Sequence, residues 1–187
     1  MGHYHLLFHD PFVNYKLYAE HIADRFDIKS LDIGHLFGDL VYIKEPEINK
    51  QIDNGKLSYF SVFTDIVISN LDSNLIIPAY PRFLDNKTEY ELLISTLTLK
   101  HFTLSSIWYV RNLNLEKTIS ESLKMKGYEG ENDFMFSRAF ENAKRNQQLT
   151  SELMNSIDYD RKFVISSDTM LEISPTTKQQ IKDLASQ

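Results

Sequence analysis

The residues best placed to do chemistry lie in one short stretch, between an apolar run at residues 4–8 and a helical pattern that starts near residue 14. A turn between a buried strand and a helix can hold a phosphate group, because backbone N–H groups and the helix N-terminus point at the anion. Such a turn needs glycines for its tight backbone, and a lysine followed by serine or threonine for the terminal phosphates and Mg²⁺. This stretch offers instead His9, Asp10, Pro11, Phe12, Asn14, Tyr15 and Lys16.

These residues occupy the position of a phosphate-binding turn between a strand and a helix, but they lack the groups that bind phosphate. The stretch contains no glycine. Pro11 has no N–H to donate, and the carboxylate of Asp10 would repel an anion. We therefore expect a degenerate phosphate loop that cannot wrap the phosphates of a nucleotide.

Histidines in the same stretch raise the alternative of a metal site. His3, His5 and His9 alternate along the expected strand and so share one face, but Asp10 is the only further ligand nearby. The more ordinary interpretation makes them polar residues at the end and edge of a strand, and we expect no metal. The chain has no cysteine, which removes disulfides, thiol catalysis and Cys-ligated zinc.

Composition limits the class of protein. The 187 residues suit one domain large enough to bury a core, and 12 Phe with 10 Tyr suit a well-filled one. The net charge of −6 argues against direct nucleic-acid binding. No apolar run approaches the roughly 20 residues of a membrane helix, and the N-terminus has no signal or transit character. We expect an intracellular, cytoplasmic protein without a membrane partner; an organelle such as the mitochondrion is the alternative.

The elements that must position the turn follow from hydrophobic patterning. Short apolar runs at 4–8, 29–33, 74–79, 105–110 and 162–166 alternate with helical patterns, which is typical of a parallel sheet covered on both faces. Ser58, Thr88 and Ser174 stand where helix caps are expected. The helical patterns cover residues 14–26, 34–42, 46–54, 58–71, 88–98, 115–126 and 132–156, with a last helix beginning at 174–175.

About 40 residues separate the second and third runs, more than one crossover helix requires. We therefore expect a single domain with a core at residues 1–29 and 72–187 and a helical insert at 30–71.

Four segments in this order resemble the adenylate kinases and other nucleoside-monophosphate kinases. NLIIPAYPRF at 74–83 resembles the family's G-F-L-L-D-G-F-P-R-T, and DIGHLF at 32–37 resembles S-T-G-D-M-F. NGKL at 54–57 resembles Q-G-E-L, and YAEHIA at 18–23 falls on Q-A-E-K-I-A. The resemblance implies a three-layer α/β/α P-loop fold with a five-stranded parallel sheet ordered 2-3-1-4-5. It also implies that residues 30–71 are the monophosphate-binding insert and that the lid is cut down to 127–132.

The resemblance also shows which functional residues have changed. Of the family's loop G-x-P-G-x-G-K-G-T only Pro11 remains, and the lysine position is Tyr15. Lys16 lies one residue on, which rotates its side chain by about 100° on a helix and makes it a surface charge rather than a displaced phosphate ligand. The family's magnesium-ordering acid falls on Pro78, and the two arginines at the entrance to its lid fall on Ser122 and Lys126.

Some positions keep a family-like residue, which implies a vestigial nucleotide site of Arg82, Arg138, Asn86, Gly34 and Lys126. Arg82 and Arg138 match arginines that hold phosphates, and Asn86 stands where a glutamine reads adenine. The structural alternative is that Arg82 ties a strand end to the insert, and that Arg138 pairs with Glu131, Asp133 or Glu141.

Loss of one transition-state donor commonly costs about 2.7–4 kcal/mol, and several are missing here together. We therefore expect a catalytically inactive scaffold or interaction protein with protein partners in a larger assembly and no cofactor. The alternative is an adenine-nucleotide-binding protein, holding AMP or ATP without catalysis, or a weak kinase. Two aromatic sets (Tyr59, Phe60, Phe63 and Phe134, Phe136, Phe140) are expected in the core, with a filled cleft or a partner anchor as alternatives.

Overall fold

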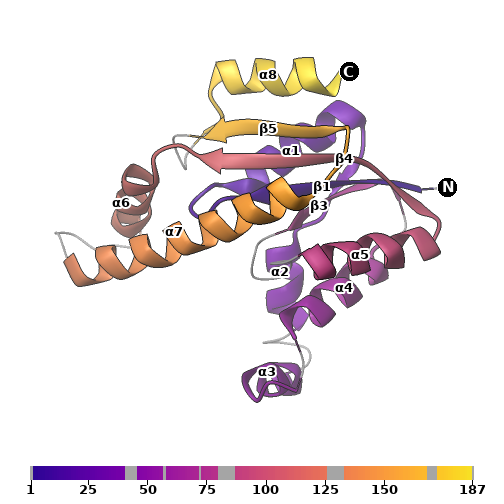
Figure 1. The fold of residues 1–187 in the computed structure, drawn as a ribbon, viewed down its shortest axis with the longest axis horizontal. Coiled ribbons are helices and arrows are strands. Elements are labelled where there is room, and N and C mark those ends of the chain that lie inside the picture. Colours follow the sequence, from indigo (N-terminus) through magenta and orange to yellow (C-terminus); the bar gives the residue numbers. More distant parts are fainter. Residues whose placement is uncertain are drawn as a thin grey trace.

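The chain folds around a five-stranded parallel β-sheet with helices on both faces (Figure 1). The computed structural model describes residues 2–40, 46–56, 58–71, 73–79, 87–125, 133–167 and 172–186. The strands are β1 (Gly2–His9), β2 (Lys29–Ser30), β3 (Leu75–Ala79), β4 (Phe102–Asn112) and β5 (Lys162–Ser167).

The strand order is β2-β3-β1-β4-β5, which confirms the predicted order. All the pairings are parallel, so β1 lies in the middle with β3 on one side and β4 on the other. Leu6 is level with Ile77 of β3 and with Ile107 of β4. Because parallel strands end at the same edge, the turn after β1 and the turn after β4 are neighbours.

Most of the helices in the described residues cover one face of the sheet or the other. Alternating side chains of β1 explain why both faces are covered: Leu6 and Phe8 enter one buried cluster, and Leu7 enters the other. α1 and α8 pack on the Leu7 face, and α2, α4, α5 and the C-terminal end of α7 pack on the opposite face. The helices are α1 (Tyr15–Phe26), α2 (Ile33–Gly38), α3 (Pro46–Asp53), α4 (Tyr59–Ser69), α5 (Lys87–Leu99), α6 (Leu115–Met125), α7 (Asp133–Ser156) and α8 (Pro175–Ala185).

Two of the predicted caps are confirmed and one is wrong. The Ser58 and Ser174 hydroxyls accept hydrogen bonds from Ser61 N and Thr177 N, each at 3.1 Å. Thr88 lies inside α5, because that helix already includes Lys87.

The predicted second strand at 29–33 is too long. β2 ends at Ser30, because the backbone turns at Leu31, whose carbonyl accepts the Ile33 N–H at 3.0 Å, and α2 then begins. The predicted lid at 127–132 lies outside the described residues. Within those residues, no helix is both long and apolar enough to cross a membrane.

Candidate functional site

Backbone N–H groups of the turn between β1 and α1 donate hydrogen bonds within the protein rather than pointing toward an anion-binding site. Asp10 N–H donates to Val110 O at 3.0 Å, and Tyr15 N–H donates to Val13 O at 2.9 Å. Pro11 has no N–H, so these three positions of the turn offer no backbone donor to a ligand. Phe12 has a φ of 59°, the left-handed region that favours glycine and costs a residue with a side chain about 1–2 kcal/mol.

Asp10 has no exposed surface, and its carboxylate points into the protein. It accepts hydrogen bonds from the Tyr109 hydroxyl at 2.6 Å, the Asn112 N–H at 2.9 Å and Gln147 Nε2 at 2.7 Å. Burial raises the pKa of Asp10, and the three hydrogen bonds oppose that rise. The carboxylate thus joins the end of β1 to β4 and α7.

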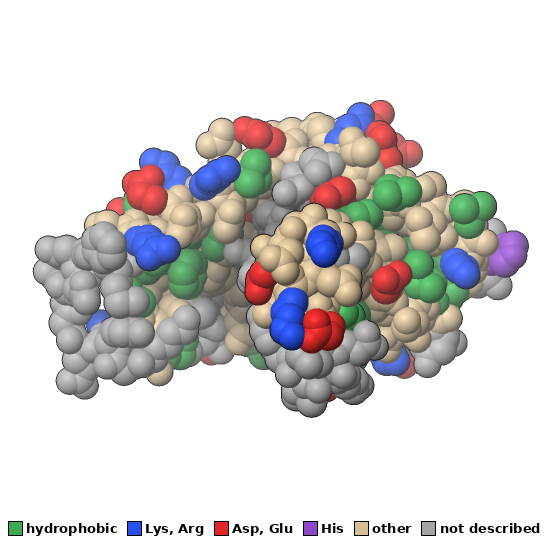
Figure 2. Space-filling view, turned by 90° about the horizontal axis from the view of Figure 1, so that it is seen from below, with side chains coloured by type: hydrophobic (Ala, Val, Ile, Leu, Met, Phe, Trp, Pro, Cys, Tyr) green, Lys and Arg blue, Asp and Glu red, His purple; other side chains and the backbone are tan. Residues whose placement is uncertain are grey.

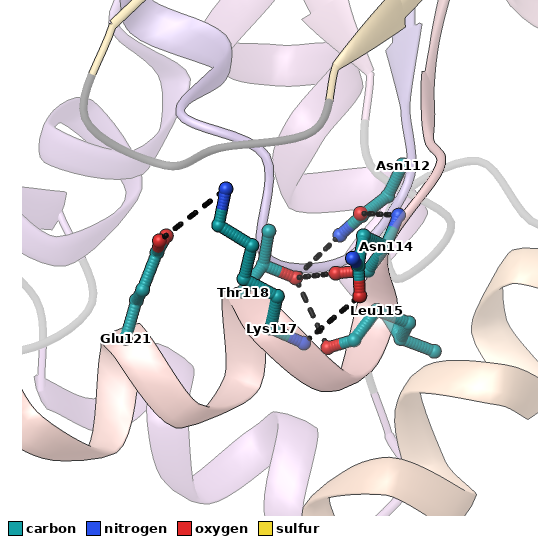
Figure 3. A network of polar contacts seen from close by, with 6 residues as sticks. All are labelled: Asn112, Asn114, Leu115, Lys117, Thr118 and Glu121. Atoms are coloured by element: carbon teal, nitrogen blue, oxygen red, sulfur yellow. Dashed lines mark hydrogen bonds and ion pairs between the residues drawn. The ribbon is translucent and has the colours of Figure 1, made fainter.

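The network continues from Asn112 into the start of α6 (Figure 3). The Asn112 amide donates to Pro11 O at 3.0 Å and to Thr118 Oγ1 at 2.8 Å. Its Oδ1 accepts from Asn114 N at 3.1 Å, and Asn114 Oδ1 in turn accepts from Lys117 N at 3.1 Å. The polar groups that end β4 therefore fix the turn after β1 and cap α6.

His9 and Tyr15 close the other side of the turn. Their rings stack with centroids 4.7 Å apart and planes 17° from parallel. His9 Nδ1 lies 3.0 Å from the Asp10 carbonyl, which can only accept, so Nδ1 carries the proton. Burial lowers the pKa of His9 to about 4, against the smaller effect of this hydrogen bond. His9 is therefore a neutral, packed side chain at pH 7.

The Tyr15 hydroxyl reaches across to α2, where it hydrogen-bonds the backbone of Gly34. A Cβ atom built on Gly34 would lie 2.7 Å from that hydroxyl oxygen, closer than real Cβ contacts allow. The position that the resemblance assigns to the phosphate-loop lysine is thus occupied by a ring that spans the gap between the β1 edge and α2.

Lys16 faces outward and forms an ion pair with Asp32. Lys16 Nζ lies 2.6 Å from Asp32 Oδ2, with side chains 50% and 41% exposed. Asp32 also caps α2, because its Oδ1 accepts from His35 N at 3.1 Å. The hydrogen bond to Asp32 raises the pKa of Lys16. An ion pair this exposed contributes about 0–1 kcal/mol, so its effect is local.

Phe12 turns away from Tyr15 and packs between α6 and α7. It lies against a small buried cluster of Leu115, Ile119 and Ala143. Phe136 and Phe140 of α7 join the same cluster and stack on each other with centroids 6.1 Å apart. Of the three α7 phenylalanines expected in the core, Phe136 and Phe140 are therefore partly buried against this small cluster, and Phe134 lies outside the residues whose side chains are described.

Of the five predicted nucleotide-site residues, the structure describes Gly34 and Arg138 and does not bring them together. Gly34 lies beside Tyr15 at the turn. Arg138 is exposed on α7, two residues from both Phe136 and Phe140, which turns it about 200° from the side that meets Phe12. Arg82, Asn86 and Lys126 lie outside the described residues.

Sequence reasoning missed the partners of Asp10. Tyr109 and Asn112 end β4, and a polar residue at the end of each of two neighbouring parallel strands is a signal that they meet. Gln147 lies in the middle of a polar helix and carries no such signal.

The N-terminal histidines are engaged separately. His5 Nδ1 lies 2.7 Å from the Ser106 hydroxyl, and the His5 ring stacks on Phe26 at 4.3 Å. Burial lowers the pKa of His5 to about 4. Within the described ranges, no group of three or more His, Cys, Asp or Glu side chains is arranged to hold a metal ion.

No protein-family model matches this sequence, and no curated protein matches it.

Proposed function

We propose that this chain is a catalytically inactive, adenylate-kinase-like protein that acts as an interaction or scaffold subunit of a larger assembly. The observation that carries the proposal is that its own side chains fill the turn where a kinase would hold phosphates. The Tyr15 ring stacks on His9, and its hydroxyl contacts Gly34. Phe12 packs between α6 and α7, and the carboxylate of Asp10 is hydrogen-bonded inside the protein.

The sheet supports the kinase-like part of the proposal. The strand order, with α2, α3 and α4 inserted between β2 and β3, is the arrangement that the resemblance implies. Because function depends on the site and not on the fold, this agreement bears on ancestry alone.

Phosphoryl transfer depends on positioning the nucleotide and neutralising its charge. Admitting phosphates here would require Tyr15 to leave its stack on His9 and the Gly34 backbone to lose its partner. The buried carboxylate of Asp10 would then stand behind a tetravalent anion. Each of these changes costs free energy. Contacts with the phosphates would not offset that cost, because the turn has neither a glycine loop nor a lysine directed inward.

Calorimetry tests the absence of nucleotide binding. The full chain at about 100 μM is titrated with ATP, ADP and AMP, each with and without Mg²⁺, beside an active adenylate kinase as positive control. We expect no binding tighter than about 1 mM, a free energy near −4 kcal/mol. Any tighter complex would favour the rival function, an adenine-nucleotide-binding protein that retains Arg82 and Arg138.

Two further measurements test catalysis and assembly. We expect no ADP above background from ATP plus AMP in a coupled assay, and kinase-like turnover would overturn the proposal. In a native extract we expect the chain to migrate with a larger, intracellular protein complex. Migration as a free 21.9 kDa chain would remove the scaffold role.

A further inference from the structure

The outer face of α5 is apolar although it faces solvent. Leu92 and Leu99 are 53% and 80% exposed, while their neighbours Leu93 and Leu97 are fully buried against the sheet. The two exposed leucines are seven residues apart and so lie on one side of the helix, with Ser95 and Thr96 between them. Figure 2 shows hydrophobic side chains scattered over this part of the surface, beside α3.

The small residues of this face hide their polar groups. Ser95 Oγ donates to Leu92 O at 2.9 Å, and Thr96 Oγ1 donates to the same carbonyl at 2.8 Å. Because these hydroxyl protons are bound to the helix backbone, Ser95 and Thr96 add a methylene and a methyl group to the face between the two leucines. We call Leu92, Ser95, Thr96 and Leu99 the α5 stripe.

In the α5 stripe, Leu-x-x-Ser-Thr-x-x-Leu, the two leucines lie equally far from its centre. A two-fold axis through that centre, perpendicular to the helix, places residues at equal distances from the centre opposite one another in the two chains. In an antiparallel pair centred between Ser95 and Thr96, each Leu92 meets the partner's Leu99, and the small residues meet at the axis. Small residues at the crossing allow two helices to approach closely.

We propose that α5 is a homodimer interface, on which a second copy of this chain docks its own α5 antiparallel to the first. The inference goes beyond the scaffold function and does not depend on whether nucleotide binds.

Charge complementarity selects a second copy as the occupant. Lys100 follows the last residue of α5 and stays on its final turn, because its N–H donates to Leu97 O at 3.1 Å and to Thr96 O at 3.3 Å. Glu89 and Lys100 project from the same flank of the α5 stripe, about 20° apart around the helix. The two-fold axis keeps each residue on its flank, so Lys100 lies within two residues, about 3 Å along the axis, of the partner's Glu89. Each pair of chains makes this contact twice.

One pair of 13-residue helices gives a small interface. Stable complexes bury about 1,200–2,000 Å², and less area is typical of weak, transient contacts. We therefore expect a dimer that forms in the micromolar range. Sedimentation velocity between about 5 and 500 μM should show the average mass rising from 21.9 kDa toward twice that value.

Matched leucine variants locate the contact. Leu99→Glu should hold the chain at monomer mass over the whole range and keep its circular dichroism, because Leu99 is 80% exposed. Leu113→Glu is the control, since Leu113 is 64% exposed in the turn between β4 and α6 and should leave association unchanged.

Charge reversal tests the antiparallel geometry without removing apolar surface. Lys100→Glu and Glu89→Lys should each weaken association several-fold, because each places like charges together. An equimolar mixture of the two variants should associate at least as well as the unaltered chain, since both contacts become attractive. A mixture no stronger than either variant alone would overturn the geometry.

A single introduced cysteine gives a covalent readout, because the chain contains none. Ser95→Cys lies next to the two-fold axis and should form a disulfide-linked dimer under mild oxidation, whereas Leu113→Cys should not. A chain that stays monomeric at all concentrations, or a dimer that Leu99→Glu leaves intact, overturns the proposal. Neither result alters the calorimetric test of nucleotide binding.

Discussion

Asp10 is an acid with no exposed surface, and its environment decides what it can do. Sequence alone suggests a charge that repels anions from the turn. The structure instead gives it three donors, the Tyr109 hydroxyl, the Asn112 N–H and the Gln147 amide. Burial and the nearby carboxylate raise the pKa of Tyr109, which keeps that hydroxyl protonated as a donor. A catalytic role would need solvent or substrate at the carboxyl group. We therefore interpret Asp10 as a structural residue that holds β4 and α7 to the end of β1.

Asp10→Asn should remove a pH dependence at little cost in stability. The raised pKa means that the folded chain keeps this proton at pH values where the unfolded chain, with the ordinary value of 3.8, has lost it. The free energy of unfolding therefore falls as the pH rises above 3.8 through the raised pKa. In the variant, the amide oxygen accepts from Asn112 and Gln147, and its NH₂ donates to the Tyr109 oxygen.

Urea unfolding at several pH values between 4 and 7 measures this effect. We expect Asp10→Asn to lie within about 1 kcal/mol of the unaltered chain at pH 7 and to lack this contribution to the pH slope. Asp10→Ala is the comparison, because it leaves the Tyr109 hydroxyl and the Asn112 N–H without this acceptor, and Gln147 Nε2 with only its bond to Asn112 O. It should cost about 3 kcal/mol or more. Equal losses in both variants would mean that the charge itself is required.

His5 and His9 should produce the opposite trend. The pKa of each is lowered to about 4, so the unfolded chain binds their protons first as the pH falls. Their stabilising effect is complete above an unfolded pKa of about 6.5 and is lost as the pH drops toward 4. At pH 5 each should cost about 2 kcal/mol relative to pH 7.

His9→Gln isolates one of these contributions. Its urea midpoint should fall less between pH 7 and pH 5 than that of the unaltered chain. The difference should correspond to the contribution of one histidine, about 2 kcal/mol. His35→Gln is the control, because His35 is exposed at α2. If the two variants kept the same acid sensitivity, His9 would not be the buried titrating group.

At the scale of elements, Tyr15 and Gly34 join the first turn of α1 to α2. The hydroxyl of Tyr15 occupies the space into which a Gly34 side chain would project. Helix propensity alone would favour Ala at this helical position by about 1 kcal/mol. The close approach of the Tyr15 hydroxyl therefore explains why glycine occupies position 34, and we expect the two residues to depend on each other.

A double-mutant cycle measures this coupling. Gly34→Ala should destabilise the unaltered chain by about 1 kcal/mol, because the new methyl group meets the Tyr15 oxygen at 2.7 Å. In a Tyr15→Phe background the same change should be neutral or stabilising, because the oxygen is gone and the helix gains propensity. Urea midpoints of the four proteins give the coupling energy. Additive effects would mean that the two residues do not touch in solution.

The elements were largely predictable because each has a local signal. Helix bounds agree with expectation to within one or two residues for α1, α3, α4, α6 and α7. β2 was predicted too long because Leu31 and Ile33 continue an apolar run, and only the hydrogen bonds of Asp32 and Leu31 show that the chain has already turned into α2. The site was less predictable, because Gln147 comes from a helix 137 residues away from Asp10.

At the scale of the whole molecule, the two edge strands of the sheet each limit strand addition in a different way. β2 is only two residues long and offers little edge. On β5, the carbonyls of Val164 and Ser166 accept from Gln180 Nε2 and Thr177 Oγ1 of α8, each at 3.3 Å. Blocked edges disfavour strand addition. A partner protein is therefore expected to use a helical surface, consistent with the α5 stripe.

The molecule should not unfold uniformly, because α3 is attached far more weakly than its neighbours. None of the described side chains of α3 is buried, and of these the partly buried Ile48 and Ile52 pack against the core. Figure 1 shows α3 apart from the sheet, below α2 and α4. α4, by contrast, buries Phe63 and Val67 completely.

Native-state hydrogen exchange should therefore separate two opening events. Amides of α3 should exchange through a local opening at a small fraction of the global free energy, whereas amides of β1 and β4 should exchange only on global unfolding. Ile52→Ala should speed exchange in α3 and leave the global urea midpoint nearly unchanged. Phe63→Ala should lower global stability by about 3–5 kcal/mol. If α3 and β1 exchanged with one common free energy, α3 would be part of the cooperative core, and its two isoleucine contacts would be stronger than their partial burial indicates.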